Sequence, residues 1–128
     1  MPISKEQCLF CNKAKQKIIY SSKLNFVVRD SYPVTKHHSL IIPHRHVSNF
    51  FDLNFEELND LNKILKEQRK SLTEIDKKIT GFNVGVNAGL DAGQSIMHCH
   101  IHLIPRRKGD IENPRGGVRG VIPSKQKY

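Results

Sequence analysis

IMHCHIHLIP, residues 96–105, places a histidine at every second position of a short apolar run. An apolar run of this length that ends at a proline predicts a β-strand. Because successive side chains of a strand point to opposite faces, His98, His100 and His102 are expected on one face, with neighbours about 6.5–7 Å apart. The residues that alternate with them, and that would point into a core, are Cys99, Ile101 and Leu103.

Three roles are open for this row of histidines. Alternate imidazoles can bind a metal ion such as zinc, at about 2.0–2.1 Å. They can also act as a nucleophile and as an acid or base, because histidine changes charge near neutral pH. The third role, a solvated surface, is disfavoured by the apolar residues between the histidines, which indicate a strand with a dry side. The row alone does not decide between the first two roles.

The segment before the row, residues 87–95 (NAGLDAGQS), is rich in glycine and alanine. Glycines let backbone N–H groups come close to an anion, and Gln94 and Ser95 add side-chain donors. The same segment would also serve as an ordinary turn between a strand at 82–87 and the strand at 96–104. The two interpretations are compatible, and they place a loop suited to oxyanions beside the histidines.

These motifs resemble the signature of the histidine triad (HIT) family, and the resemblance covers roughly residues 8–105. It implies hydrolysis or transfer at the α-phosphate of a nucleotide, through a nucleotidyl-histidine intermediate. The residues that carry it are Asn87, Gly93-Gln94-Ser95 and His98-x-His100-x-His102, together with Asp30 and the segment HSLIIPHRH at 38–46.

The resemblance also implies a role for each residue of the site. His100 is expected to be the nucleophile, and His102 to donate a hydrogen bond to a phosphate oxygen. Ser95 is expected to act at the α-phosphate or the leaving group, and His38 to support the triad. Asp30 would accept hydrogen bonds from ribose hydroxyls, and this mechanism requires no metal. The residues expected to bind phosphate are Asn87, Gly93, Gln94, Ser95 and His102.

The third histidine of the row bears on the type of reaction. Relatives that transfer nucleotides to another phosphate carry glutamine at the position of His102, so the histidine favours water as the acceptor. We therefore expect a hydrolase, and the basic, Arg-rich tail favours a dinucleoside polyphosphate similar to diadenosine tetraphosphate as its substrate. The alternatives are an adenosine phosphoramidate as substrate and a nucleotide-binding regulatory module with little turnover.

A second candidate site begins at CLFC, residues 8–11, a spacing of cysteines that commonly supplies half of a tetrahedral zinc site. Many bacterial and archaeal members of the HIT family complete such a site with a mid-chain histidine and the first histidine of the triad row. The expected structural zinc, one per chain, would therefore be bound by Cys8, Cys11, His46 and His98. A disulfide and two unengaged thiols are the alternatives, and His44 is a competing ligand.

The chain has 128 residues and a formal net charge of +9. We expect residues 1–128 to form a single HIT domain in which residues 106–128 are an extended basic tail. The positive charge favours anionic partners, which include nucleotides and nucleic acid. By the resemblance a purine nucleotide is the expected partner, and nucleic acid is not expected, because the basic residues are spread along the chain. Arg107, Arg115 and Arg119 are candidate ligands for the distal phosphates of a long substrate, with a mobile basic tail as the alternative.

The expected fold is α+β, a five-stranded and mostly antiparallel sheet with one long helix packed on it. Strands are predicted at 18–21, 26–29, 39–42, 82–87 and 96–104. A helix is predicted over about 55–79, with Asn54 and Glu57 as a capping box and Gly81 at its end. The apolar stripe that should pack on the sheet consists of Leu58, Leu61, Ile64, Leu65, Leu72, Ile75 and Ile79.

Two expectations concern the surroundings of the protein. By the resemblance, the chain is expected to form a homodimer through the long helix and the fourth strand. The first thirty residues lack the pattern of a signal peptide, and no segment approaches the ~20 apolar residues of a membrane helix. We therefore expect a cytoplasmic protein that does not enter a membrane.

Overall fold

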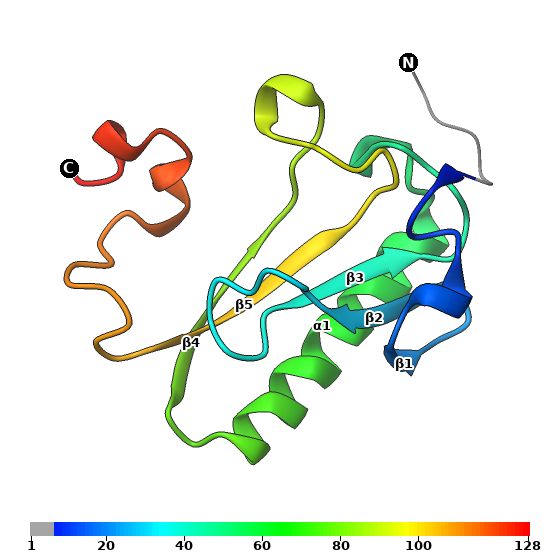
Figure 1. Cartoon of the computed structure of the whole chain (residues 1–128). Helices are drawn as coiled ribbons and strands as arrows, with labels where there is room; N and C mark the ends of the chain where they lie inside the picture. The colour runs from blue at the N-terminus through cyan, green and yellow to red at the C-terminus, as the bar shows by residue number, and fades with distance from the viewer. Residues whose placement is uncertain (1–6) are drawn as a thin grey trace.

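A computed structural model describes residues 7–128, in which a five-stranded sheet carries one long α-helix (Figure 1). The strands follow the order β1-β2-β3-β5-β4, and each neighbouring pair is antiparallel. The predicted α+β fold is confirmed. The strands are β1 (Ile18–Ser21), β2 (Asn25–Arg29), β3 (Ser39–Pro43), β4 (Ile79–Gly85) and β5 (Ile101–Arg107), and the helix is α1 (Phe55–Ile75).

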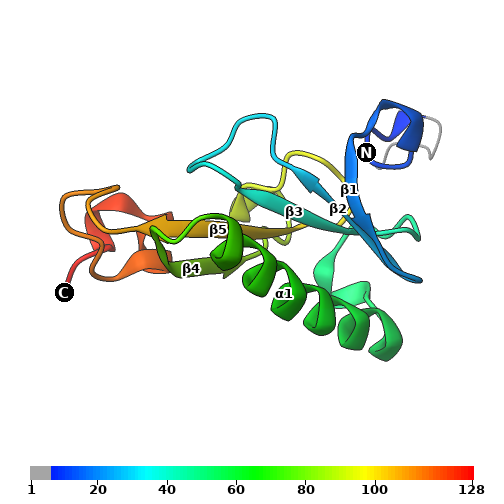
Figure 2. The same ribbon diagram turned by 90° about the horizontal axis from the view of Figure 1, so that it is seen from below.

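Different parts of the chain cover the two faces of the sheet. Helix α1 lies along one face (Figure 2), where the core joins Val27 and Ile41 to Ile64 and Leu72. The other face is covered by the N-terminal segment, in a second apolar cluster made of Cys8, Phe10, Phe26, Val28, Leu40 and Ile42. The alternation of apolar residues along β2 and β3 therefore supplies two cores, and the triad histidines lie next to the second one.

Helix α1 begins with the predicted capping box, in which the Asn54 side chain accepts from the N–H of Glu57 and Glu57 accepts from the N–H of Asn54. Its end differs from the prediction, because the helix stops at Ile75 and not at Ile79. Asp76 leaves the helical conformation, and its carboxylate accepts from the N–H of Lys78 at 3.0 Å and from Arg107 at 2.9 Å. These bonds turn the chain directly into β4.

The face of α1 that packs on the sheet also differs in part from the predicted stripe. Leu58 is 38% exposed and Ile75 is 63% exposed, so neither belongs to the core. Two polar side chains, Glu57 and Gln68, are buried instead. The buried residues follow helical spacing and are Glu57, Leu61, Ile64, Gln68 and Leu72.

The strands on either side of the glycine-rich loop are shifted from their predicted positions. Strand β4 covers Ile79–Gly85, so Gly81 lies inside it, and β5 begins only at Ile101. His98 and His100 therefore precede the strand, where the N–H of Cys99 bonds to the carbonyl of Val47 at 2.7 Å. The alternation of faces nevertheless holds, because Cys99, Ile101 and Leu103 all belong to the helix-side core, although His98 and His100 are buried too.

The C-terminal residues after β5 lie outside the sheet and contain the 3-10 helices η5 (Gly117–Val121) and η6 (Pro123–Lys125). They lie at the β4 end of the sheet, whereas residues 7–15 lie at the β1 end (Figures 1 and 2). The guanidinium groups of Arg115 and Arg119 lie over the Tyr128 ring, 4.7 and 4.9 Å from its centroid. Among residues 7–128, no helix has the length and apolar character needed to cross a membrane.

Candidate functional site: a metal-ligand cluster beside two ordered histidines

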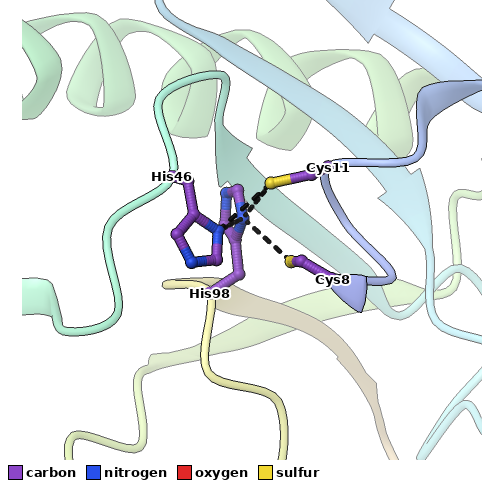
Figure 3. Close-up of side chains that lie close together, drawn as sticks. All are labelled: Cys8, Cys11, His46 and His98. Atoms are coloured by element: carbon purple, nitrogen blue, oxygen red, sulfur yellow. Dashed lines mark hydrogen bonds between the residues drawn. The ribbon is translucent and has the colours of Figure 1, made fainter. Parts of the chain in front are cut away.

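Two cysteines and two histidines converge near the N-terminal segment (Figure 3). Cys11 Sγ lies 3.1 Å from His46 Nδ1 and 3.4 Å from His98 Nδ1. Cys8 Sγ lies 3.4 Å from His98 Nδ1, and the two Nδ1 atoms are 3.1 Å apart. One ligand atom from each residue lies within 4.8 Å of every other, so the four residues could hold one metal ion.

These spacings of 3.1–3.4 Å lie within or slightly below the range of a tetrahedral zinc site. Zinc lies about 2.0–2.1 Å from imidazole nitrogen and about 2.3 Å from thiolate sulfur, which puts tetrahedral ligand atoms roughly 3.3–3.8 Å apart. His98 also has the required tautomer, because its Nε2–H donates to the carbonyl of Pro43 at 2.8 Å and leaves the Nδ1 lone pair facing the cysteines. Burial lowers the pKa of His98 to about 4, which keeps its ring neutral.

Local structure explains why His46 and His98 face each other. Arg45 extends to the N-terminus of α1, where its guanidinium donates to the buried carboxylate of Glu57 at 2.7 and 3.1 Å. This ion pair anchors the His46 segment to α1, and the bond from the Cys99 N–H to the Val47 carbonyl holds that segment beside the His98 segment. His44 lies apart from the cluster, near Lys13 and the carbonyl of Ser22.

A second group of possible ligands, Asp30, His38 and His102, has a different hydrogen-bond pattern. The N–H of Val34 donates to His38 Nδ1 at 3.0 Å, so His38 Nε2 must carry the proton. His38 Nε2–H then donates to His102 Nδ1 at 2.9 Å. The Asp30 carboxylate lies 3.4 Å from His38 Nε2. The proton on His38 Nε2 leaves that nitrogen without a lone pair for a metal. The three residues instead form a chain of hydrogen bonds, and because His102 Nδ1 is an acceptor in it, the proton of the neutral His102 ring is on Nε2.

His100 has the opposite tautomer to His102. Its Nδ1–H donates to the main-chain carbonyl of His98 at 2.8 Å, which leaves an unprotonated Nε2. The centroids of the His100 and His102 rings are 5.4 Å apart. Burial lowers the pKa of His102 to about 4 and also lowers the pKa of His38, so both rings are neutral at pH 7. The pair therefore offers one lone pair and one N–H donor side by side.

The glycine-rich loop precedes these histidines. Gly89 and Gly93 have positive φ angles of 99° and 93°, which glycine adopts without strain. The Gln94 side chain is buried within the protein: it accepts from the N–H of Gly89 at 2.9 Å and donates to the carbonyls of Ser48 and Ile96. These bonds fix the loop, and a side-chain contact from Gln94 to phosphate would have to replace one of them. No pattern in the sequence indicates this inward orientation.

The remaining predicted residues are distributed around the loop and the tail. Ser95 is exposed, and Asn87 lies beside Gly93, where an added Cβ would come within 3.9 Å of the Asn87 amide. A cavity of about 490 Å³ opens beside His38 and His102. It is also lined by Asn87 and by the tail residues Gly117, Val118, Gly120 and Val121. Arg107, the third arginine considered for phosphate binding, is paired with Asp76.

One residue missed by the sequence analysis is Phe10, which lies inside the CxxC segment and is 3% exposed. Its ring centroid is 5.2 Å from that of His100 and 6.0 Å from that of His98. In the sequence, an aromatic residue between two cysteines is typical of a hydrophobic core. Its contact with the triad histidines becomes visible only in the folded structure.

Comparisons with known proteins agree with this arrangement. A family model described as the HIT domain matches residues 12–109. A zinc-bound histidine triad family protein from Mycobacterium smegmatis has a similar structure, with a TM-score of 0.77 and 27% identity over 86% of this chain and 82% of that one. An uncharacterised HIT-like protein of Methanocaldococcus jannaschii is 32% identical over 121 residues, covering 89% of this chain and 91% of its own.

A relative with a stated activity is the asymmetrical bis(5'-nucleosyl)-tetraphosphatase of Schizosaccharomyces pombe. It is 33% identical over 95 residues, or 74% of this chain. The chain spans about half of that protein, since the matched region is 52% of its length. The similarity therefore concerns the domain that carries the histidines.

Proposed function

The chain belongs to the HIT family, and on that premise we propose that it hydrolyses a dinucleoside polyphosphate at the α-phosphate through a covalent intermediate on His100. The observation that carries the proposal is the tautomer of His100. Its Nδ1–H is held by the carbonyl of His98 at 2.8 Å, so that Nε2 is free to attack phosphorus. The adjacent His102 supplies a neutral N–H donor for a phosphate oxygen.

The reaction has two displacement steps at one phosphorus atom. In the first, Nε2 of His100 forms a bond to the α-phosphorus, and the bond from phosphorus to the bridging oxygen breaks, with its electron pair leaving on the departing phosphate. In the second, water attacks the same phosphorus, the P–N bond breaks, and its electron pair returns to Nε2. The water proton leaves to solvent, and the product is a nucleoside monophosphate.

The other site residues bind and orient the substrate. Ser95 binds phosphate oxygens, Asn87 orients the loop, and Asp30 accepts from ribose hydroxyls. The N–H groups of Gly93 and Gln94 already donate to the carbonyls of Leu90 and Gly89, at 3.0 and 3.1 Å, so the expected phosphate contact at Gly93 would have to replace such a bond. We assign Gln94 to the support of the loop, because its side chain already makes three hydrogen bonds within the protein. The proposed catalytic residues are His100, His102, Ser95 and His38.

The choice of polyphosphate over phosphoramidate follows from the activity named for the Schizosaccharomyces pombe relative and from the net charge of +9. We propose to measure turnover of diadenosine tetraphosphate and of an adenosine phosphoramidate side by side. The expected result is faster hydrolysis of the tetraphosphate, to AMP and ATP. Faster hydrolysis of the phosphoramidate would reject the substrate class but keep the mechanism, and no turnover of either would favour the regulatory alternative.

Three further assignments accompany the function. The cysteine and histidine cluster is proposed to hold one structural zinc per chain, which clips the N-terminal segment to the histidines. A homodimer is proposed through α1 and β4, because β4 is an edge strand and a groove between the two elements is lined by Leu65, Phe82 and Val84. Residues 1–128 are proposed to act as a single HIT domain in the cytoplasm.

The hydrogen bond from His38 to His102 leads to a prediction about turnover. His38→Phe removes the donor that fixes the tautomer of His102, and we expect kcat for diadenosine tetraphosphate to fall about 100-fold. His38→Gln keeps an N–H donor of similar reach, so it should recover a large part of this loss. Steady-state kinetics of the two variants would test the assignment, and equal rates in His38→Phe and wild type would contradict it.

A further inference from the structure

The CxxC segment carries Phe10 to the wall of the proposed active site. The exposed fractions of the two residues between the cysteines differ sharply, with Leu9 48% exposed and Phe10 only 3% exposed. The Phe10 ring meets the His100 ring at an interplanar angle of 65°, with 5.2 Å between the centroids. This is an edge contact within the range that aromatic pairs prefer. The segment therefore turns one side chain to solvent and the other against His100.

A second contact, a hydrogen bond to the main chain, also joins His100 to the cluster of Cys8, Cys11, His46 and His98. The main-chain carbonyl of His98 is the acceptor for His100 Nδ1–H at 2.8 Å, and the ring of His98 belongs to the cluster. These two contacts on the His100 ring thus come from residues tied to the cluster, one from its cysteine side and one from its histidine side, whereas its third contact is with the His102 ring at 5.4 Å between centroids. A bound zinc would hold the four side chains together and hence these two contacts.

From this geometry we infer that Phe10 is a positioning residue for the His100 ring, and that metal at the four-residue cluster holds it there. The inference rests on the proposed function, in which Nε2 of His100 attacks phosphorus. The covalent bond to Cβ and the hydrogen bond at Nδ1 restrict the torsions of the His100 side chain, but a hydrogen bond tolerates a range of angles and leaves some tilt of the ring open. The edge of Phe10, packed against the ring, restricts this tilt, so that Nε2 keeps its direction toward the phosphate.

The kinetic consequence is a loss of rate with little loss of binding. Displacing a reacting atom by ~1 Å can cost up to about 100-fold in rate. Phe10→Leu keeps an apolar side chain in the second core but loses the ring edge, and we expect kcat for diadenosine tetraphosphate to fall about tenfold. The dissociation constant for AMP should change less than about threefold, since the phosphate donors are untouched.

The experiment compares Phe10→Leu and Phe10→Ala with Leu9→Ala as the matched control, because Leu9 lies on the same segment but faces solvent. Elemental analysis establishes that each variant keeps zinc. Long-range ¹⁵N–¹H spectra then report the tautomer of His100 and the line widths of its ring signals. We expect one sharp tautomer with Nδ1 protonated in wild type and Leu9→Ala, and broadened or mixed signals in both Phe10 variants. Removing zinc from wild type with a chelator should broaden the His100 signals in the same way.

Three outcomes would overturn the inference. Unchanged His100 signals and unchanged kcat in Phe10→Leu would show that the ring contact has no role. A rise in the AMP dissociation constant that accounts for the whole loss would make Phe10 a nucleotide contact instead. Unchanged His100 signals after zinc removal would show that the metal does not affect the orientation of the His100 ring. Failure of the proposed function is distinguishable, because then a His100→Asn variant would also keep its turnover.

Discussion

His100→Asn should lower the turnover of diadenosine tetraphosphate by about 10⁴-fold or more, because the attacking nitrogen is lost. Asparagine can still donate its amide N–H to the carbonyl of His98, so the local backbone should be retained. The dissociation constant for AMP should therefore change only a few-fold, since His102 and the loop keep their donors. Single-turnover kinetics and calorimetric titration with AMP measure the two quantities separately.

The matched control is His37→Asn, one residue from the proposed site. His37 has a positive φ of 75°, a conformation that asparagine tolerates better than most residues, so the change should not disturb the fold. Wild-type protein that is quenched during turnover should yield an adenylylated peptide with the label on His100. Unchanged turnover in His100→Asn, or a label on another residue, would reject the covalent mechanism.

The sheet could be predicted from the sequence because its signals are local. β1 covers Ile18–Ser21 as predicted, and β2 and β3 each extend the prediction by one residue. Alternation at Cys99, Ile101 and Leu103 likewise identifies the side chains of the helix-side core. A period of two is imposed by backbone geometry and is visible in any short apolar run.

The start of β5 could not be predicted, because it depends on contacts between distant segments. The N–H of Cys99 bonds to Val47, and the ring of His98 turns toward Cys8 and Cys11, which draws this part of the chain out of the ladder. The end of α1 was missed for a similar reason, since Asp76 is paired with Arg107 from another strand. The residues that neighbour Cys99 and Asp76 in the sequence do not indicate that Val47 and Arg107 will be their partners.

The orientation of polar side chains also could not be predicted from the sequence. Gln94 was assigned to phosphate by its position in the loop, yet its amide is directed inward to Ser48 and Ile96. Glu57 was identified as a capping residue, but its burial and its pairing with Arg45 depend on the packing of α1. A short motif specifies which residues are close in the chain, whereas the direction of each side chain is set by the surrounding fold.

Replacing both CxxC cysteines, in a Cys8→Ser and Cys11→Ser variant, should remove zinc and lower the free energy of unfolding by about 3 kcal/mol or more. The reason is that the proposed zinc would bind only the folded chain and would join the N-terminal segment to His46 and His98, which lie far away in the sequence. For a domain of this size the melting temperature should fall by roughly 10 °C. Elemental analysis and calorimetric melting measure the two effects.

Cys99→Ala provides the control for this prediction, because Cys99 is a thiol outside the cluster. Its side chain is 1% exposed in the helix-side core and is not part of the group that could hold a metal, and burial raises its pKa to about 12. Wild type and Cys99→Ala should each contain one zinc per chain, and a chelator should lower both melting temperatures. The double cysteine variant should not respond to the chelator. The contrary result is wild-type protein, purified without chelator, that contains no zinc and melts at the same temperature with and without chelator. That result would mean that hydrogen bonds alone hold the cluster, and it would contradict the proposed effect of metal on His100.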